Sequence, residues 1–164
     1  MKKRIVLLLS LMGVMVALSA TAAFALTDYG TNGNDTLVGT AESDHLYGLR
    51  GDDVIRGLGD HDFLVGGPGN DTVRGGGGFD EIGLGPGHDT AYGGPGADFI
   101  VGHLGDDDIY GEGGADTIIV QDGVGGNDLA VCGPGADIAY VDSPFEVDTS
   151  TCEVFTTEPF PDPV

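Results

Sequence analysis

Aliphatic residues recur every nine positions along most of the chain, each flanked by residues of mixed type. A β-strand points alternate side chains to opposite faces, so in Thr72-Val73-Arg74 the valine faces one side and its neighbours face the other. The pattern predicts short strands that each give one side chain to a core. The ten inward residues are Leu37, Leu46, Ile55, Leu64, Val73, Ile82, Ala91, Ile100, Ile109 and Ile118.

Glycine-rich segments separate these strands, most clearly in GGPGNDTV (66–73), GGGGFDEI (75–82) and GGPGADFI (93–100). Glycine adopts positive φ and allows close backbone approach, so the chain can reverse tightly at each segment. Two turns and two strands form one coil of 18 residues, and successive coils stack at the strand spacing of about 4.7–4.9 Å. We therefore expect an all-β solenoid of ten tandem nonapeptide repeats over residues 30–119.

Composition changes this picture little. The chain has 31 glycines among 164 residues and no tryptophan, a bias shared with collagen and disordered chains. Collagen requires glycine at every third position, whereas the period here is nine. Disordered chains contain few aliphatic residues, whereas here they recur regularly.

An aspartate stands two places before each inward aliphatic residue, and these aspartates are candidate metal ligands. Because each half-coil reverses direction, consecutive aspartates fall on opposite edges of the solenoid. One edge carries Asp35, Asp53, Asp71, Asp89 and Asp107, and the other carries Asp44, Asp62, Asp80, Asp98 and Asp116.

Stacked carboxylates oppose folding unless a cation lies between them. Two such charges about 4.8 Å apart repel by about 1 kcal/mol even in bulk water, and the aliphatic core is thin. Carboxylate and turn carbonyl oxygens are hard ligands, which select Ca²⁺. Mg²⁺ demands a smaller, more regular site and retains its water, and Zn²⁺ prefers histidine or thiolate. We expect several Ca²⁺ ions between successive coils.

The first 25 residues predict export. A basic start (Met1–Arg4) precedes an apolar run, and Ala23-Phe24-Ala25 fits a signal peptidase site. The alternative is an uncleaved membrane anchor. Cleavage after Ala25 leaves three arginines and all 27 acidic residues, so the formal charge becomes 3 − 27 = −24. Such a chain repels nucleic acid and anionic membranes, and we expect it to be secreted.

The repeat GGxGxDxUx, with U aliphatic, resembles the RTX-type calcium-binding nonapeptide repeat. The resemblance implies a right-handed parallel β-roll with Ca²⁺ held between aspartates 18 residues apart, such as Asp53 and Asp71, and by turn carbonyls. Some turns depart from the repeat: Glu42 and Asp60 replace the fourth-position glycine, Leu84 the first, and His103 and Glu112 the second. We expect the weakest site at Asp44 and the strongest ions between Asp53 and Asp98.

After Ile119 the period slips, and residues 120–164 are expected to form a C-terminal cap followed by a loose proline-rich tail. Cys132 and Cys152 are the only cysteines, and an even count in an exported chain favours a disulfide between them. The alternative is two unpaired buried thiols.

The sequence favours binding over catalysis. It contains no HExxH, GxSxG or CxxC motif, so we expect no enzymatic activity. The first interpretation is a secreted calcium-binding protein with a structural or interaction role. The alternative is a calcium-dependent accessory module of a secreted hydrolase or adhesin.

One sheet is predicted to be more apolar on its outer face than the other. We expect this face to contact a protein or cell-surface partner, or to be covered by the segment from Val120 to Phe160. The protein should otherwise be a monomer. The apolar outer residues are Phe63, Val65, Phe99, Val101 and Ile119.

Overall fold

The computed structural model describes residues 24–120, 127–141, 148, 151–152 and 154–156, and the predicted signal peptide and tail lie almost entirely outside them. The described residues form fourteen strands and no helix, and therefore no helix able to cross a membrane. One sheet contains β1 (Thr27–Tyr29), β3 (His45–Tyr47), β5 (Phe63–Val65), β7 (Glu81–Gly83), β9 (Phe99–Val101), β11 (Thr117–Ile119), β13 (Ile138–Tyr140) and β14 (Val154–Thr156). The other contains β2 (Thr36–Val38), β4 (Val54–Gly59), β6 (Thr72–Gly77), β8 (Thr90–Pro95), β10 (Asp108–Gly113) and β12 (Leu129–Val131).

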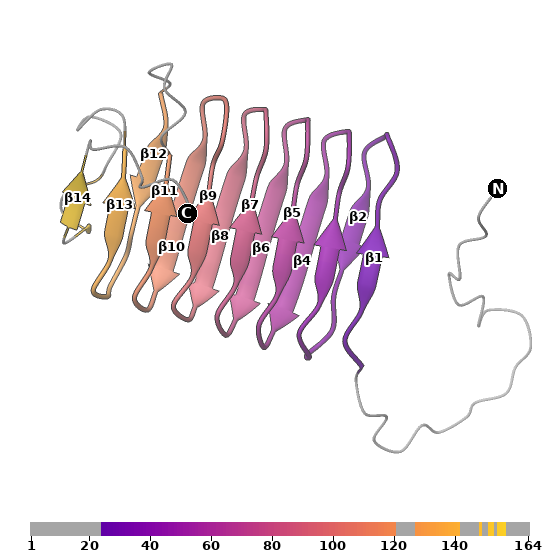
Figure 1. The fold of residues 1–164 in the computed structure, drawn as a ribbon, viewed down its shortest axis with the longest axis horizontal. Coiled ribbons are helices and arrows are strands. Elements are labelled where there is room, and N and C mark those ends of the chain that lie inside the picture. The colour runs from indigo at the N-terminus through magenta and orange to yellow at the C-terminus, as the bar shows by residue number, and fades with distance from the viewer. Residues whose placement is uncertain (1–23, 121–126, 142–147, 149–150, 153, 157–164) are drawn as a thin grey trace, which may run out of the picture.

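Strands alternate between the two sheets as the chain winds forward, and all neighbours within a sheet are parallel. In Figure 1 the two sheets lie face to face, and the turns form two long edges, upper and lower. Residues 18 apart are in register, as in Val73↔Ala91 and Ile82↔Ile100. All ten predicted inward residues are buried, so the predicted parallel β-roll and its single-layer core are confirmed.

The stacking continues past Ile119, where the sequence predicts the boundary of the cap. β12 pairs with β10 in the register Asp108↔Leu129, and β13 pairs with β11. The coil that contains this step spans 21 residues instead of 18, and residues 121–126 lie outside the described part of the chain. The three extra residues are therefore accommodated within one coil, and the strands that follow keep the register of both sheets.

Two features mark the ends of the roll. At the N-terminal end, β1 places Asp28 in register with Leu46, so an exposed acidic residue occupies the position that is aliphatic in the later coils. Towards the C-terminal end, a disulfide joins Cys132 and Cys152, whose Cα atoms are 5.0 Å apart, as the sequence predicts. Both cysteines are buried against the end of the core.

Candidate metal centres at the turns

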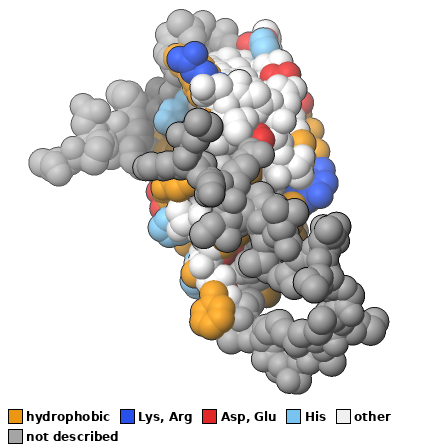
Figure 2. Space-filling model, turned by 90° about the vertical axis from the view of Figure 1, so that its right-hand side faces the viewer, with side chains coloured by type: hydrophobic (Ala, Val, Ile, Leu, Met, Phe, Trp, Pro, Cys, Tyr) orange, Lys and Arg blue, Asp and Glu red, His pale blue; other side chains and the backbone are white. Residues whose placement is uncertain are grey.

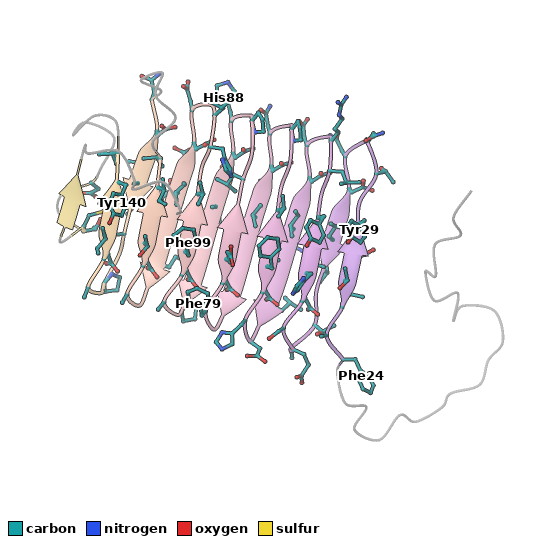
Figure 3. The ribbon with its side chains drawn as sticks, viewed as in Figure 1. Phe24, Tyr29, Phe79, His88, Phe99 and Tyr140 are labelled. Atoms are coloured by element: carbon teal, nitrogen blue, oxygen red, sulfur yellow. A yellow bond between two sulfur atoms is a disulfide. The ribbon has the colours of Figure 1, made fainter. Side chains whose placement is uncertain are left out.

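The repeated aspartates lie at the two edges of the roll, as predicted. Figure 3 shows His88, which precedes Asp89, at the upper edge, and Phe79, which precedes Asp80, at the lower edge. The side chains are buried inside the turns rather than displayed on the surface: every repeated aspartate from Asp44 to Asp116 is at most 3% exposed. Where Figure 2 is not covered by grey atoms, acidic atoms appear only as small scattered spots.

One oxygen of each repeated carboxylate from Asp44 to Asp116 is held by the neighbouring coil. The N–H of Asp53 donates to Oδ1 of Asp71 at 2.8 Å, and the N–H of Asp71 donates to Oδ1 of Asp89 at 2.6 Å. The same bond repeats along both edges from Asp35 to Asp116, with lengths of 2.6–2.9 Å. Each carboxylate is thus fixed in orientation by backbone that the fold already positions.

The second oxygen has no hydrogen-bond partner in most turns. Among the described residues, Oδ2 is buried without a partner in Asp53, Asp62, Asp71, Asp80, Asp89, Asp98, Asp116 and Asp137. Leaving a buried charged oxygen unpaired is costly, so such atoms require an explanation. A regular series of them along both edges indicates sites for a ligand that compensates negative charge.

Other oxygens surround this unpaired atom. If Gly66 carried a Cβ atom, it would lie 2.5 Å from Oδ2 of Asp71 and 2.6 Å from the carbonyl oxygen of Leu84 in the next coil. At Gly66 a side chain would collide with both oxygens, whereas Leu84 itself occupies the first position of the Asp89 turn. The Leu84 carbonyl accepts from the N–H of Gly67 at 2.8 Å and keeps a second lone pair, so together with Oδ2 it offers oxygen ligands to a hard cation.

The first two turns differ, because threonines satisfy their carboxylates. Oδ2 of Asp35 accepts hydrogen bonds from Thr31 N–H at 2.5 Å and Thr31 Oγ1 at 2.6 Å. Oδ2 of Asp44 accepts from Thr40 N–H, and its Oδ1 accepts from the N–H of Leu26. These two aspartates are therefore paired within the protein, unlike the eight aspartates with an unpaired Oδ2.

Thr31 and Thr40 occupy the second position of their turns, and the backbone conformation at that position explains why these two carboxylates are paired. From the third turn onward the residue at this position has a positive φ, even where it is not glycine: 91° for Leu58, 72° for His103 and 72° for Glu112. The two threonines have no such φ, which leaves their N–H groups directed at the aspartate.

The fourth-position departures behave differently from each other. Asp60 adopts a φ of 68°, the left-handed conformation that aspartate tolerates. Glu42 has no positive φ, and its N–H donates to Thr40 Oγ1 at 3.1 Å. The Asp44 turn is thus distinct, as the sequence indicates, but Thr40 contributes to the difference as much as Glu42.

Sequence analysis missed two members of the aspartate columns, Asp128 and Asp137. Oδ1 of Asp128 accepts from the N–H of Asp107 at 2.7 Å, and Oδ1 of Asp137 accepts from the N–H of Asp116 at 2.8 Å. The longer coil had hidden them by breaking the period. The signal was present, because GPGAD at 133–137 repeats GPGAD at 94–98.

Burial raises the pKa of these carboxyl groups. It raises the pKa of Asp62, Asp71 and Asp116 to about 6, and that of Asp89 and Asp98 to about 7. The backbone hydrogen bond to each carboxylate lowers the pKa, while neighbouring aspartates of the same column raise it further. The calcium-free turns therefore disfavour the charged carboxylates that a cation would stabilise.

This charge burial predicts the pH dependence of the calcium-free protein. An unfolded aspartate has a pKa of about 3.9, so between that value and the raised folded values the folded chain binds more protons. The free energy of unfolding must then fall as pH rises from about 4 to 7. Thermal melts of decalcified protein, in enough osmolyte to populate the fold and followed by circular dichroism, should show a higher Tm at pH 5 than at pH 7.5. Excess calcium should reverse this order, and a calcium-free Tm that rises with pH would contradict the prediction.

The fold and the turns together define a metal-binding β-solenoid. No group of three histidine, cysteine or acidic side chains converges among the described residues, so backbone carbonyls must supply a large share of any ligand set. Ca²⁺ accepts six to eight oxygen ligands, carbonyls included, in flexible geometry. The turns therefore fit Ca²⁺ better than Zn²⁺, which prefers nitrogen and sulfur ligands.

The family comparison identifies this class further. The sequence profile of the RTX calcium-binding nonapeptide repeat matches residues 29–64, 47–82 and 84–118, which together make up more than half of the chain. The chain belongs to this family of calcium-binding repeats, which is not a catalytic family. No curated protein and no solved structure shows a significant match to this chain.

Proposed function

We propose that this chain is a secreted, non-enzymatic protein whose β-roll folds on binding several Ca²⁺ ions between successive coils, with a structural or interaction role. The observation that carries the proposal is the series of buried, unpaired Oδ2 atoms, which in turns such as that of Asp71 lie near a carbonyl oxygen of the next coil. The aspartates proposed as ligands on this ground are Asp53, Asp62, Asp71, Asp80, Asp89, Asp98, Asp116 and Asp137.

The other repeated aspartates have different proposed roles. Asp107 and Asp128 belong to the same column. Oδ1 of Asp107 accepts from the Asp89 N–H, and Oδ1 of Asp128 accepts from the Asp107 N–H, so both remain candidate ligands. Asp35 and Asp44, which sequence analysis included among the ligands, are proposed to close the N-terminal end of the columns through Thr31 and Thr40.

Two observations support export. The N-terminal segment has the basic, apolar and small-residue order of a signal peptide. The Cys132–Cys152 disulfide is of a kind that persists in oxidising compartments and is rare in the cytosol. RTX repeats also occur typically in secreted proteins.

Ion selectivity and stoichiometry test the proposal. The exported and processed protein, stripped of metal, should bind several Ca²⁺ ions per chain in isothermal titration calorimetry, and should gain β structure as it does so. Mg²⁺ at the same concentration should produce little structure, because it gives up its water reluctantly and needs regular octahedral geometry. The variant Asp108→Asn, which removes an exposed carboxylate outside the columns, serves as the control and should bind the same number of ions. Binding of one ion or none, or an equal response to Mg²⁺, would rule the proposal out.

A further inference from the structure

Strand β7 interrupts both outward columns of the eight-stranded sheet. In the column Phe63–Glu81–Phe99 it places a carboxylate between two aromatic rings. In the column Val65–Gly83–Val101 it places no side chain between two valines. Phe99 lies midway between the two edges of the roll, on the face of this sheet (Figure 3).

The double interruption leaves a hollow of about 220 Å³ in the sheet face. A volume of this size is several times that of a water molecule. A Cβ atom on Gly83 would meet only Nε2 of His103, at 3.8 Å, so the space above this glycine is open. The hollow is lined mainly by Phe63, Val65, Glu81, Gly83, Phe99 and His103.

The apolar face is therefore not a uniform ladder. Its phenylalanines and valines are half-buried, and only Glu81 and His103 are exposed at the hollow. The described parts of residues 120–160 extend the sheets as β12, β13 and β14 instead of covering this face. The hollow thus stays open in the part of the chain that the structure describes.

The Glu81 carboxylate at the hollow has no ion-pair or hydrogen-bond partner among the described residues. Two of the three arginines after the signal segment, Arg56 and Arg74, lie on strands of the other sheet, and the whole chain carries a net charge of −21. A carboxylate set between aromatic rings in such a protein is complementary to a cation.

The strand spacing suits a cation in this position. Phe63 and Phe99 are two strands apart, or about 9.4–9.8 Å. Both rings line the hollow, so a cation bound there meets two aromatic side chains, which attract cations within about 6 Å of the ring centre. The opposite sheet already contains such a contact between neighbouring strands, where the Arg74 guanidinium carbon lies 4.1 Å from the centre of the Tyr92 ring.

We propose that this hollow binds a quaternary ammonium group, of the kind carried by choline. An ammonium with hydrogen-bond donors, such as that of lysine, would lose hydration among walls whose side-chain acceptors are the Glu81 carboxylate and the His103 ring. A quaternary ammonium has no donors to satisfy, and it gains from the aromatic rings and from Glu81 together.

A titration with matched ligands tests the proposal. Calcium-loaded protein, purified after export, is titrated with choline and with 3,3-dimethylbutan-1-ol, its neutral isostere, while NMR follows the Gly83 amide and the Phe63 and Phe99 rings. Choline should shift these resonances saturably, and the isostere should bind at least about tenfold more weakly. Equal binding of both, tighter binding of Nα-acetyl-lysinamide, or no saturable shift would overturn the proposal.

Two variants locate the site, and a third serves as control. Gly83→Val fills the hollow and restores an unbroken valine column, so it should keep the circular dichroism spectrum and abolish choline binding. Glu81→Gln should weaken binding about tenfold. Glu42→Gln, which removes an exposed carboxylate elsewhere, should leave binding unchanged. Choline binding that survives Gly83→Val in a folded protein would place any site elsewhere and refute the assignment.

Discussion

Removing calcium at neutral pH should unfold the roll almost completely. The core is one side chain deep, and it must stabilise a chain with 31 glycines, each of which loses much conformational freedom on folding. At pH 7.5 the fold must also bury columns of carboxylates whose pKa burial raises, to about 7 in Asp89 and Asp98. Ion binding that occurs only in the folded state adds the missing stability. Circular dichroism in EDTA should therefore show a disordered spectrum, and millimolar Ca²⁺ should restore the β spectrum.

The transition should be steep. In the proposed arrangement each ion contacts two successive coils, so the first ions prepare the sites of the next, and structure should appear over a narrow range of Ca²⁺ concentration. Calorimetry should show a melting transition whose Tm rises with Ca²⁺ concentration. Reduction of the Cys132–Cys152 disulfide should loosen only the C-terminal end, where the Cys132 carbonyl lies beside the Asp116 turn, and leave the earlier turns unchanged. A β spectrum that persists unchanged in excess EDTA at pH 7.5 would show that the core alone suffices.

The second large effect should depend on position within a column. Asp71→Ala should raise the Ca²⁺ midpoint of folding about tenfold or more, since it removes a carboxylate whose Oδ2 lacks any protein partner and which adjoins coils on both sides. Asp35→Ala should shift the midpoint by only about threefold or less. Its carboxylate is half-buried at the end of the column and already bonded to Thr31.

An isosteric variant separates charge from hydrogen bonding. Asp71→Asn keeps an oxygen able to accept from the Asp53 N–H and removes the buried charge. This variant should raise the Ca²⁺ midpoint of folding as Asp71→Ala does. In EDTA at pH 7.5, with enough osmolyte to populate the fold, it should be no less stable than the wild type. Equal midpoint shifts for Asp35→Ala and Asp71→Ala would count against ions stacked between the coils.

Sequence alone predicted most of the architecture, because one physical pattern repeats. The alternation around residues such as Val73 assigned the inward positions, and the nine-residue period assigned the two edges. Three features escaped it. Thr31 and Thr40 satisfy their aspartates through a backbone conformation that residue type does not reveal. Asp137 was missed because three extra residues shifted the period. The hollow over Gly83 became visible only when strands 18 residues apart were aligned.

Asp28 has a consequence for how far the roll can grow. Coils of this kind are interchangeable, and the end of one roll is a template for the next, so a stack of identical coils has no inherent length. A second molecule that docked on the N-terminal end would have to strip water from the Asp28 carboxylate, which stands where the stack continues with Leu46. Such desolvation costs several kcal/mol for an unpaired ion. We therefore expect Asp28 to disfavour the stacking of a second molecule on the N-terminal end of the roll.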